Sequence, residues 1–426
     1  MRILVLGGGG REHAIVTSLL ESVHSPEVFC SPGNGGTAEI ATNVEITEGD
    51  PVFVAEWVER NAIDFVVVGP EAPLVAGMAD ILLADGVPVF GPKAAGAHLE
   101  GSKAYAKDLM ERYNIPTGRY SAVDRLEDAN EYFAEFGAPV VVKADGLAAG
   151  KGVTVAMTVD EARDAVEVAL SGAFGPAGEV VVIEEYLEGP ECSLLAFTDG
   201  ETVLPMLTAQ DHKRALDGDE GLNTGGMGVF APVPVVDKAA FAQMVAILEK
   251  TVAALRSEGI VYRGILYGGF ILTADGPKVL EYNVRFGDPE TQVLLPLLKT
   301  DLIDVMMATA EGRLHEIELE WRDEVAVCVV LASGGYPAES TPGKIITGID
   351  DAAGIEGVTI YHAGTARMSD GTLLTSGGRV LNVTAVAPSF NEARDRAYQA
   401  VDRISFEDMH FRTDIGLKAI ASAGEA

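Results

Sequence analysis

The most informative segment of the chain reads Leu280-Glu281-Tyr282-Asn283-Val284-Arg285-Phe286-Gly287-Asp288-Pro289-Glu290. Side chains repeat every second residue along a strand, so Glu281, Asn283 and Arg285 are expected to share one face. A carboxylate and an amide oxygen suit a hard cation such as Mg²⁺, and a guanidinium suits a phosphoryl or carboxylate oxygen. Taken alone, the pattern also fits a half-buried strand with a polar outer face. Together with the segments below, it indicates nucleoside triphosphate chemistry.

The length and the cysteines set the broad class. The chain has 426 residues, enough for about two to four domains with buried cores. No apolar run approaches the roughly eighteen residues that cross a bilayer, and the apolar start Met1–Leu6 ends in glycines and Arg11, unlike a signal peptide. We therefore expect a cytoplasmic protein. Cys30, Cys192 and Cys328 are far apart and lack metal-binding spacing, so neither a disulfide framework nor a zinc site is expected.

Acidic residues dominate the composition. The 64 Asp and Glu residues against 31 Lys and Arg give a net charge of −33. Such a charge repels nucleic acid and anionic membranes, so neither is an expected partner. The acids are dispersed, as in Gly218-Asp219-Glu220 and in residues 316–324, which is typical of a solvated surface. We hypothesise adaptation to high salt, where counterions screen the self-repulsion.

The first hundred residues alternate strands, glycine turns and helices. Ile3–Leu6 leads through Gly7–Gly10 into a helix that reaches Leu20, and Phe65–Val68 and Val87–Phe90 end in further glycine turns. Continuous apolar strands of this kind predict a parallel sheet covered on both faces. Ligands of such α/β sheets bind at the carboxyl ends of the strands.

The first glycine turn has more than one interpretation. Gly7-x-Gly9 begins a dinucleotide-binding fingerprint, but Glu12 stands where the third glycine is required, so an oxidoreductase is weakly supported. Backbone N–H groups at the start of the helix, together with Arg11, suit an anion instead. A tight turn without a ligand is the alternative.

A second glycine-rich segment follows a strand that ends in a lysine. Pro139–Lys143 is the predicted strand, and residues 144–153 turn back into another one. The loop is not a Walker A loop, because Gly152 stands where Ser or Thr should follow Lys151. A flexible glycine loop suits phosphates through its backbone donors and its lysines, whereas a solvated hairpin is the alternative. Downstream, Thr158 with Glu161 predicts a capping box that opens a helix.

Two polar segments follow further along the chain. Gln210–Arg214 comes after a strand, and the glycine-rich Asn223–Gly228 comes shortly afterwards. A long loop in a compact domain is usually functional or disordered, and Asn223 and Thr224 offer donors to a small polar substrate. His212 is a general base by residue type, but beside a lysine and an arginine an orienting hydrogen-bond partner is the favoured interpretation.

The last hundred residues have a different pattern. Val325–Leu331, Val358–His362 and Arg379–Val386 are predicted strands, and a capped helix starts at Ser389. This pattern favours a separate α+β domain of ordinary size. The predicted domains are residues 1–102, residues 103–325 with a lid at about 121–190, and residues 326–426.

Together these segments resemble the ATP-grasp superfamily, and within it the glycinamide ribonucleotide synthetase family, over nearly the whole chain. Each motif is modestly specific, whereas the whole series in order is highly specific. The motifs are Gly9-Gly10-Arg11-Glu12-His13, Pro32-Gly33-Asn34, Gly69-Pro70-Glu71-Ala72-Pro73-Leu74, Gly101-Ser102-Lys103, Lys143–Val153, Gln210-Asp211-His212-Lys213, Asn223–Gly228 and Arg285–Glu290. The resemblance implies a Rossmann-like N-terminal domain, an ATP-grasp fold with a mobile lid, and a C-terminal α+β domain.

The resemblance also implies an activity: an ATP-dependent carboxylate-amine ligase of purine biosynthesis. Glycine would be phosphorylated on its carboxylate, and the amine of 5-phosphoribosylamine would attack the glycyl phosphate. The products would be N1-(5-phosphoribosyl)glycinamide, ADP and phosphate. ATP would bind with Mg²⁺ or Mn²⁺, and the family resemblance suggests a monomer.

The same resemblance implies roles for single residues. Glu281 and Asn283 would carry the metal, and Arg285 would steady the transferred phosphoryl group. ATP would contact Lys103, Lys143, Gly146, Gly150, Lys151, Gly152, Glu184, Glu185, Tyr186, Leu187 and Glu191. Phosphoribosylamine would contact Gly9, Gly10, Arg11, Asn34 and Glu71. Glycine and the ribosyl hydroxyls would meet Asp211, Lys213, Asn223, Thr224, Gly225 and Gly226, and Asp288 completes the substrate set.

Three alternatives stay open beside this interpretation. Another ATP-grasp ligase or carboxylase, such as one acting on bicarbonate, would differ in Asn223–Gly228. A nucleotide-binding sensor without catalysis is disfavoured by the presence of Lys143 and Glu281, and a nicotinamide oxidoreductase fails at Glu12. One departure from the superfamily is that residues 266–270 supply no further metal carboxylate, so a metal would depend on phosphate and water oxygens.

The acidic composition generates a prediction about salt. If the acids form a self-repelling coat, the free energy of unfolding rises as NaCl or KCl is added across the molar range, because the ions screen that repulsion. Chemical denaturation with urea, which is uncharged, measures the change. A free energy of unfolding that does not depend on salt would contradict the hypothesis.

Overall fold

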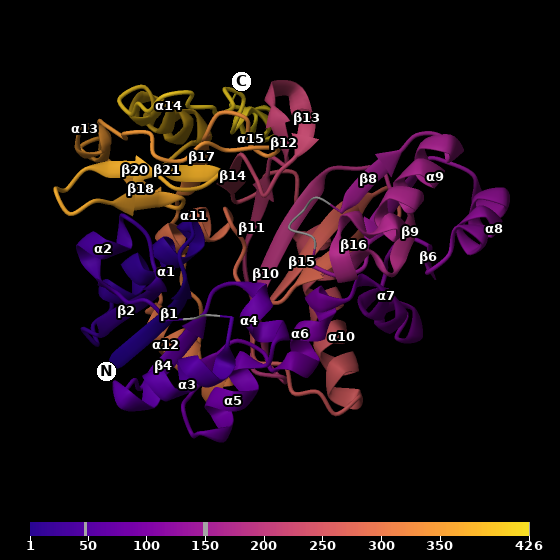
Figure 1. Cartoon of the computed structure of the whole chain (residues 1–426), viewed down its shortest axis with the longest axis horizontal. Helices are drawn as coiled ribbons and strands as arrows, with labels where there is room; N and C mark the ends of the chain where they lie inside the picture. Colours follow the sequence, from indigo (N-terminus) through magenta and orange to yellow (C-terminus); the bar gives the residue numbers. More distant parts are fainter. Residues whose placement is uncertain (47–48, 148–151, 426) are drawn as a thin grey trace.

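A computed structural model describes residues 1–46, 49–147 and 152–425 of the chain. The N-terminal part and the lid lie beside a large sheet that continues into the C-terminal part, with the lid at the right of Figure 1. Among the described residues, no helix is long and apolar enough to cross a membrane. All three cysteines are buried, as expected of small core residues.

The N-terminal part is the predicted parallel α/β sheet, with strand order β3-β2-β1-β4-β5. Leu4 and Leu6 of β1 pack in one hydrophobic cluster, whereas Ile3 and Val5 pack in another. Both faces of the strand are therefore covered, which explains its continuous apolar sequence. The strands are β1 (Arg2–Gly7), β2 (Glu27–Pro32), β3 (Thr42–Asn43), β4 (Phe65–Val68) and β5 (Val89–Phe90). The helices of this part are α1 (Gly10–Leu20), α2 (Thr37–Ile40), α3 (Pro51–Arg60), α4 (Glu71–Val75), α5 (Met78–Ala84) and α6 (Ala94–Gly101).

The lid follows helix α7 (Lys103–Arg112) and has a hydrophobic core of its own. Its sheet has the order β6-β9-β7-β8 and packs against α8 and α9. The predicted capping box is confirmed, since the Glu161 amide donates to Thr158 Oγ1 over 3.2 Å and the Thr158 amide donates back to the Glu161 carboxylate. The lid elements are β6 (Tyr120–Val123), α8 (Leu126–Phe136), β7 (Val140–Ala144), β8 (Val153–Ala156), α9 (Val159–Val168) and β9 (Val181–Glu185).

An eight-stranded antiparallel sheet of order β16-β15-β10-β11-β14-β17-β21-β18 spans the rest of the molecule. Its first part carries the segment around Glu281, and β14 pairs with β17 through Gly228↔Val329 to Ala231↔Ala326. The sheet therefore runs across residue 325, where the sequence predicted a domain boundary. The strands are β10 (Glu191–Thr198), β11 (Val203–Asp211), β14 (Gly228–Ala231), β15 (Gly264–Thr273), β16 (Gly276–Asn283), β17 (Val325–Ala332), β18 (Val358–His362) and β21 (Arg379–Ala387).

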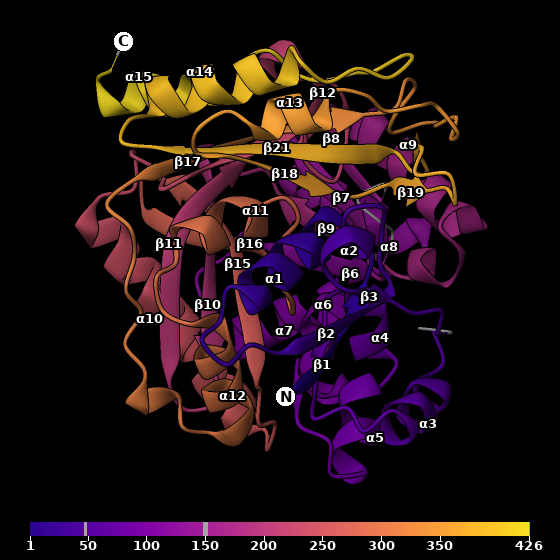
Figure 2. The same cartoon turned by 90° about the vertical axis from the view of Figure 1, so that its left-hand side faces the viewer.

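Helix α14 (Phe390–Val401) lies over β17 and β21, as the side view in Figure 2 shows. Its start is capped as predicted, because the Glu392 amide donates to Ser389 Oγ. The other helices are α10 (Lys238–Ser257), α11 (Thr291–Leu294), α12 (Leu302–Glu311), α13 (Ile349–Ala353) and α15 (Leu417–Ala423). Two small hairpins pair β12 (Arg214–Leu216) with β13 (Glu220–Asn223), and β19 (Thr365–Arg367) with β20 (Leu373–Thr375).

Two buried histidines join the N-terminal and C-terminal parts. The His362 amide donates to His13 Nδ1 over 2.8 Å, and the two rings lie 5.4 Å apart. Burial, reinforced by the neighbouring His362, lowers the pKa of His13 to about 3. Burial and the charge of Arg367 lower the pKa of His362 to about 4. Both rings are therefore neutral in the folded protein near neutral pH.

These pKa values predict acid sensitivity. Histidine has an ordinary pKa of 6.5, so between about pH 6.5 and 4 the unfolded chain binds protons that the folded histidines do not. The free energy of unfolding therefore falls as the pH falls through this range. The variant His13→Asn keeps a hydrogen-bond acceptor but cannot titrate, so its pH slope is smaller than that of the wild type in urea titrations.

The exposed His315, whose side chain is 67% accessible, provides the control. His315→Gln should leave the slope unchanged, because this substitution lies on the surface and does not touch the buried histidine pair. A slope reduced equally by His13→Asn and His315→Gln would show that the buried pair is not its cause.

Candidate active site

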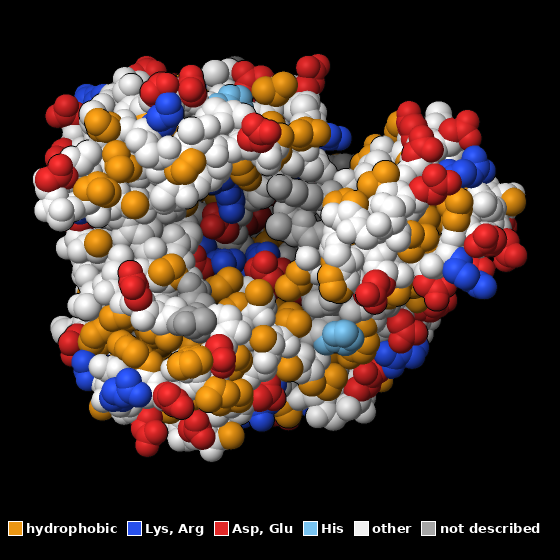
Figure 3. Space-filling view, viewed as in Figure 1, with side chains coloured by type: hydrophobic (Ala, Val, Ile, Leu, Met, Phe, Trp, Pro, Cys, Tyr) orange, Lys and Arg blue, Asp and Glu red, His pale blue; other side chains and the backbone are white. Residues whose placement is uncertain are grey.

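A cleft of about 1370 Å³ lies between the lid, the N-terminal part and the central sheet. In Figure 3 it is the central hollow, in which basic and acidic side chains are both visible. Of the 31 Lys and Arg residues in the chain, nine of those described line the cleft, against eleven of the 64 Asp and Glu residues. The cleft therefore holds a larger share of the chain's cations than of its acids, although the acids still outnumber the cations there.

The row around Glu281 faces this cleft. Tyr282 points to the opposite side, where its hydroxyl contacts Thr251 over 2.6 Å. Strand β16 ends at Asn283, so Arg285 lies beyond the strand, yet its Nη2 still donates to Asn283 Oδ1 over 3.1 Å. The structure therefore brings Glu281, Asn283 and Arg285 together. Arg285 joins the other two through its hydrogen bond to Asn283, because the strand no longer places it there.

Arg285 is held by two carboxylates. Its Nε donates to Glu71 over 3.1 Å and its Nη2 donates to Glu100 over 2.9 Å. Burial alone would raise the pKa of Glu71, but the charges of Arg285 and Arg11 hold it below its usual value. Burial raises the pKa of Glu100, and the nearby Glu71 adds to that shift. The guanidinium is therefore fixed in direction before any substrate arrives.

Glu184 joins two lysines inside the cleft. Its carboxylate lies 2.8 Å from Lys107 Nζ and 2.9 Å from Lys143 Nζ, and all three side chains are almost fully buried. Burial would raise the pKa of Glu184, but the charges of Lys143 and Lys107 lower it. Lys143 also donates to the carbonyl oxygen of Leu280 over 3.2 Å. These contacts bring the Lys143 ammonium to the strand that carries Glu281.

Lys103 ties the start of the lid loop to α7. Its Nζ donates to the carbonyl oxygen of Gly146 over 3.0 Å, and the Ala104 amide donates to the Asp145 carboxylate over 2.6 Å. A side chain at Gly146 would come within 2.9 Å of Ala177, so packing requires this glycine. Gly152 lines the cleft. The predicted contacts of Gly150 and Lys151 lie outside the described residues.

The segment predicted to hold the adenine is Glu184–Leu187, at and just after the end of β9, and it lines the cleft. The carboxylate of Glu185 accepts the Arg119 amide over 3.1 Å. Glu191 also lines the cleft, where burial raises the pKa of its carboxyl and Lys213 opposes the shift.

The polar loops also meet at the cleft. Lys213 Nζ lies 3.0 Å from the Asp211 carboxylate, and Thr224 Oγ1 donates to the carbonyl oxygen of Lys213 over 2.9 Å. Arg379 of the C-terminal part donates through Nη1 to the carbonyl oxygens of Gly225 and Asp288, each over 2.8 Å. One arginine thus fixes the glycine-rich loop against the segment that follows β16.

His212 is buried beside these loops. Its ring packs edge-on against Phe230, and burial, with the charge of Arg412, lowers its pKa to about 4. Neither ring nitrogen has a hydrogen-bond partner among the described residues. The prediction that this ring orients a neighbour by hydrogen bonding is therefore wrong.

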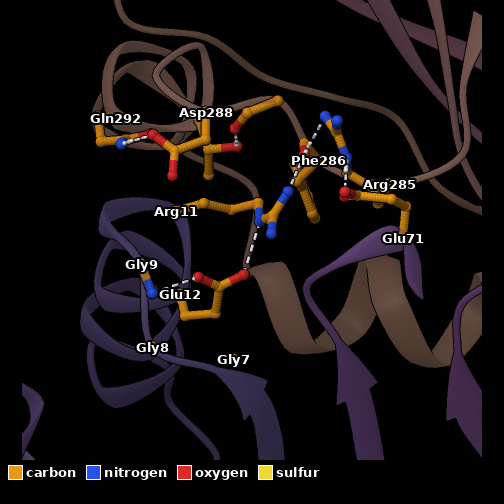
Figure 4. Close-up of polar contacts among 12 residues, drawn as sticks. Gly7, Gly8, Gly9, Arg11, Glu12, Glu71, Arg285, Phe286, Asp288 and Gln292 are labelled. Carbon is orange, nitrogen blue, oxygen red and sulfur yellow. Dashed lines mark hydrogen bonds and ion pairs between the residues drawn. The ribbon is translucent and has the colours of Figure 1, made fainter. Parts of the chain in front are cut away.

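The glycine turn after β1 is drawn in Figure 4. The Gly9 amide donates to Glu12 Oε2 over 2.7 Å, and Arg11 Nη1 donates to the carbonyl oxygen of Phe286 over 3.0 Å. Asn34 is buried, and its Nδ2 donates to the carbonyl oxygens of Gly8 and His362. Asn34 therefore links the N-terminal turn to the C-terminal part.

Most of the predicted site residues line this one cleft, and a few do not. Among the described residues, five predicted ones do not line the cleft: Gly9, Gly10, Asn34, Gly146 and Gly226. A side chain at Gly10 would collide with Asn382 and Gln292, so close packing requires that glycine. The predicted residues that line it are Arg11, Glu71, Lys103, Lys143, Gly152, Glu184, Glu185, Tyr186, Leu187, Glu191, Asp211, Lys213, Asn223, Thr224, Gly225, Glu281, Asn283, Arg285 and Asp288.

The charged residues of the site that sequence reasoning missed include Glu100, Lys107 and Arg379. Each binds a partner that is distant in sequence, as Glu100 does with Arg285, 185 residues away. Glu100 precedes the Gly101-Ser102-Lys103 motif, which is the one local signal that could have pointed to it.

Comparison with known proteins identifies the family. Three family models of phosphoribosylglycinamide synthetase match this chain. The model of the N domain matches residues 1–100, that of the ATP-grasp (A) domain matches residues 101–291, and that of the C domain matches residues 326–418. The phosphoribosylamine–glycine ligase of Brucella melitensis is 48% identical over 99% of this chain and 98% of its own length. The chain belongs to the phosphoribosylglycinamide synthetase family. It is therefore an ATP-grasp ligase, as the sequence predicted.

Two further relatives agree with this assignment. The phosphoribosylamine–glycine ligase of Rhizobium meliloti is 49% identical to this synthetase over 99% of each chain. The crystal structure of the phosphoribosylamine–glycine ligase of Thermotoga maritima has a TM-score of 0.86 and 35% identity, and it covers 97% of this chain and 100% of its own. The fold described above is therefore the synthetase fold.

The synthetase site has donors that suit a magnesium ion. The Glu281 carboxylate forms no hydrogen bond or ion pair with the residues that the structure describes. Burial would raise its pKa, but the charges of Lys143 and Lys213, with those of Lys103 and Arg285, lower it. An ionised carboxylate that faces the cleft without a partner, beside the amide of Asn283, fits a hard cation.

This site predicts the effect of removing the Glu281 charge. Glu281→Gln should lower Mg²⁺-dependent turnover of ATP by roughly 100-fold, because a carboxylate that suits the metal and the counter-charge of three lysines are lost together. Steady-state ADP release at several Mg²⁺ concentrations measures it. Glu249→Gln, at an exposed position of α10, is the matched control. Equal rates of ADP release in the two variants would show that Glu281 has no role in the Mg²⁺-dependent reaction.

Proposed function

We propose that this chain joins glycine to 5-phosphoribosylamine at the cost of one ATP, giving N1-(5-phosphoribosyl)glycinamide, ADP and phosphate. This is the second step of purine synthesis from small precursors. The family and the printed names of the relatives support the reaction. The carrying observation is the cleft in which Lys103 and Lys143 face the row of Glu281, Asn283 and Arg285.

In the first step a glycine carboxylate oxygen attacks the γ-phosphorus of ATP, and the bond to the ADP oxygen breaks. Phosphoryl transfer asks the protein mainly for positioning and charge neutralisation. Lys103 and Lys143 hold the triphosphate, and the fixed guanidinium of Arg285 steadies the transferred group. Mg²⁺ or Mn²⁺ held by Glu281 and Asn283 would supply further neutralisation of the phosphate oxygens.

In the second step the amine nitrogen of phosphoribosylamine attacks the carbonyl carbon of the glycyl phosphate. The nitrogen loses a proton, the carbon–oxygen bond to phosphate breaks, and the amide forms. The intermediate hydrolyses in water, so the lid must exclude solvent while it exists. The separate core of the lid supports its movement as one body.

The two substrates are assigned to two groups of cleft residues. Arg11 and Glu71 from the N-terminal part bind phosphoribosylamine. Asp211, Lys213 and the loop of Asn223–Gly225 bind glycine and the ribosyl hydroxyls. The charged pairs that fix these groups, such as Lys213 with Asp211, support the assignment. The monomeric state and the cytoplasmic location stay predictions.

Omission of single substrates tests the proposed reaction. With ATP, Mg²⁺, glycine and phosphoribosylamine present, ADP and phosphoribosylglycinamide form in equal amounts, because one ATP is cleaved for each amide. Leaving out glycine should stop ADP release, since no carboxylate accepts the phosphoryl group. ADP release that needs bicarbonate instead of glycine would overturn the proposal in favour of a carboxylase.

A further inference from the structure

Glu12 occupies the anion position at the start of α1. Its side chain is 2% accessible, and three glycines surround its carboxyl group. A Cβ atom added to Gly7, Gly9 or Gly69 would come within 2.6, 2.9 and 2.0 Å of Glu12 side-chain atoms. These three glycines, two at or just after the end of β1 and one after β4, therefore make room for a carboxylate of the protein itself.

The Glu12 carboxylate uses both of its oxygens. Oε2 accepts the Gly9 amide over 2.7 Å, and Oε1 accepts Arg11 Nε over 2.6 Å (Figure 4). In a dinucleotide-binding turn, the amide at the helix start points at a ligand phosphate. Here the Gly9 amide already has an acceptor in Glu12, whereas the Arg11 side chain lines the cleft.

Arg11 is held on a second side by the segment after β16. Its Nη1 donates to the carbonyl oxygen of Phe286 over 3.0 Å, and its side chain is only 10% accessible. The same guanidinium lines the cleft, near Glu71 and Asp288, whose pKa values it helps to lower. Nη2 has no hydrogen-bond partner among the described residues, which leaves one donor edge for a ligand.

We propose that Glu12 is a positioning residue that fixes the Arg11 guanidinium at the cleft for the phosphoribosyl substrate. The inference rests on the proposed function and deepens it. Glu12 touches no substrate; it acts by fixing Nε, so that the free edge of Arg11 points into the cleft. Hydrogen bonds between charged groups are shorter and stronger than neutral ones, so the charge of Glu12 matters as well as its shape.

A purely structural role for Glu12 would be helix capping, and the chain contains a matched case. Glu161 stands at the equivalent position of the capping box at α9 and accepts the Thr158 amide over 3.2 Å. No ion pair joins Glu161 to an arginine among the described residues. The two glutamates therefore share the cap and differ in the attached guanidinium.

The test compares Glu12→Gln with Glu161→Gln. Glu12→Gln keeps an acceptor for the Gly9 amide but loses the charge that holds Arg11. The KM for phosphoribosylamine should rise about tenfold, the usual scale for a lost hydrogen bond to a charged group. The KM values for ATP and glycine should stay within about twofold, and Glu161→Gln should change none of the three.

Arg11→Gln and the double variant complete the cycle. Arg11→Gln should raise the same KM, and adding Glu12→Gln to it should have almost no further effect, because Glu12 acts through Arg11. Independent, multiplying effects would overturn the proposal, as would an equal rise in all three KM values. If Glu12→Gln fails to fold, Arg11→Gln still tests the proposal. An unchanged KM for phosphoribosylamine in Arg11→Gln would by itself overturn the proposal.

These experiments distinguish failure of the positioning role from failure of the proposed reaction. A wild-type enzyme that needs no phosphoribosylamine for product formation refutes the reaction itself. A wild-type enzyme that needs it, with an unchanged KM in Glu12→Gln, refutes only the positioning role.

Discussion

The pairing of buried charges across the cleft is the constraint on which the rest of the site depends. An unpaired charge taken out of water is costly, so a buried ion is stable where it meets a partner with good geometry. Arg285 meets Glu71 and Glu100, while Glu184 meets Lys107 and Lys143. The partners come from the N-terminal part, α7, the lid and the segment after β16. The same ion pairs that direct these groups at a triphosphate therefore also hold the parts of the chain together.

Two further arginines of the cleft, Arg379 and Arg11, are also held by oxygen atoms of the protein. Arg379 bridges the glycine-rich loop and Asp288, and Glu12 fixes Arg11 beside the segment after β16. Each arginine is oriented by oxygens of the protein before a substrate arrives. Preorganised donors need no rearrangement during the reaction, which is how electrostatic catalysis gains its effect. An acidic chain can thus present oriented cations to anionic substrates.

Several elements followed from local sequence because their causes are local. Both faces of β1 are apolar, and the structure buries both. The Thr158 and Ser389 caps depend on residues three positions apart. The Glu281 row was visible because strand periodicity places alternate residues on one side. By contrast, the pairing of β14 with β17 joins segments about a hundred residues apart, and no local pattern encodes such a register.

The sequence by itself determined the class of the protein: its alternating apolar strands, its glycine turns and its ordered motifs indicated an ATP-grasp ligase. Tertiary structure alone decided which of those motif residues face a substrate and which serve packing. Gly10 and Asn34 belong to recognised motifs, yet they pack the N-terminal part against the C-terminal part. Glu100 lies outside the recognised motifs, yet it holds Arg285. Periodicity and motif spacing are properties of neighbours in the chain, whereas charge pairing and burial depend on neighbours in space.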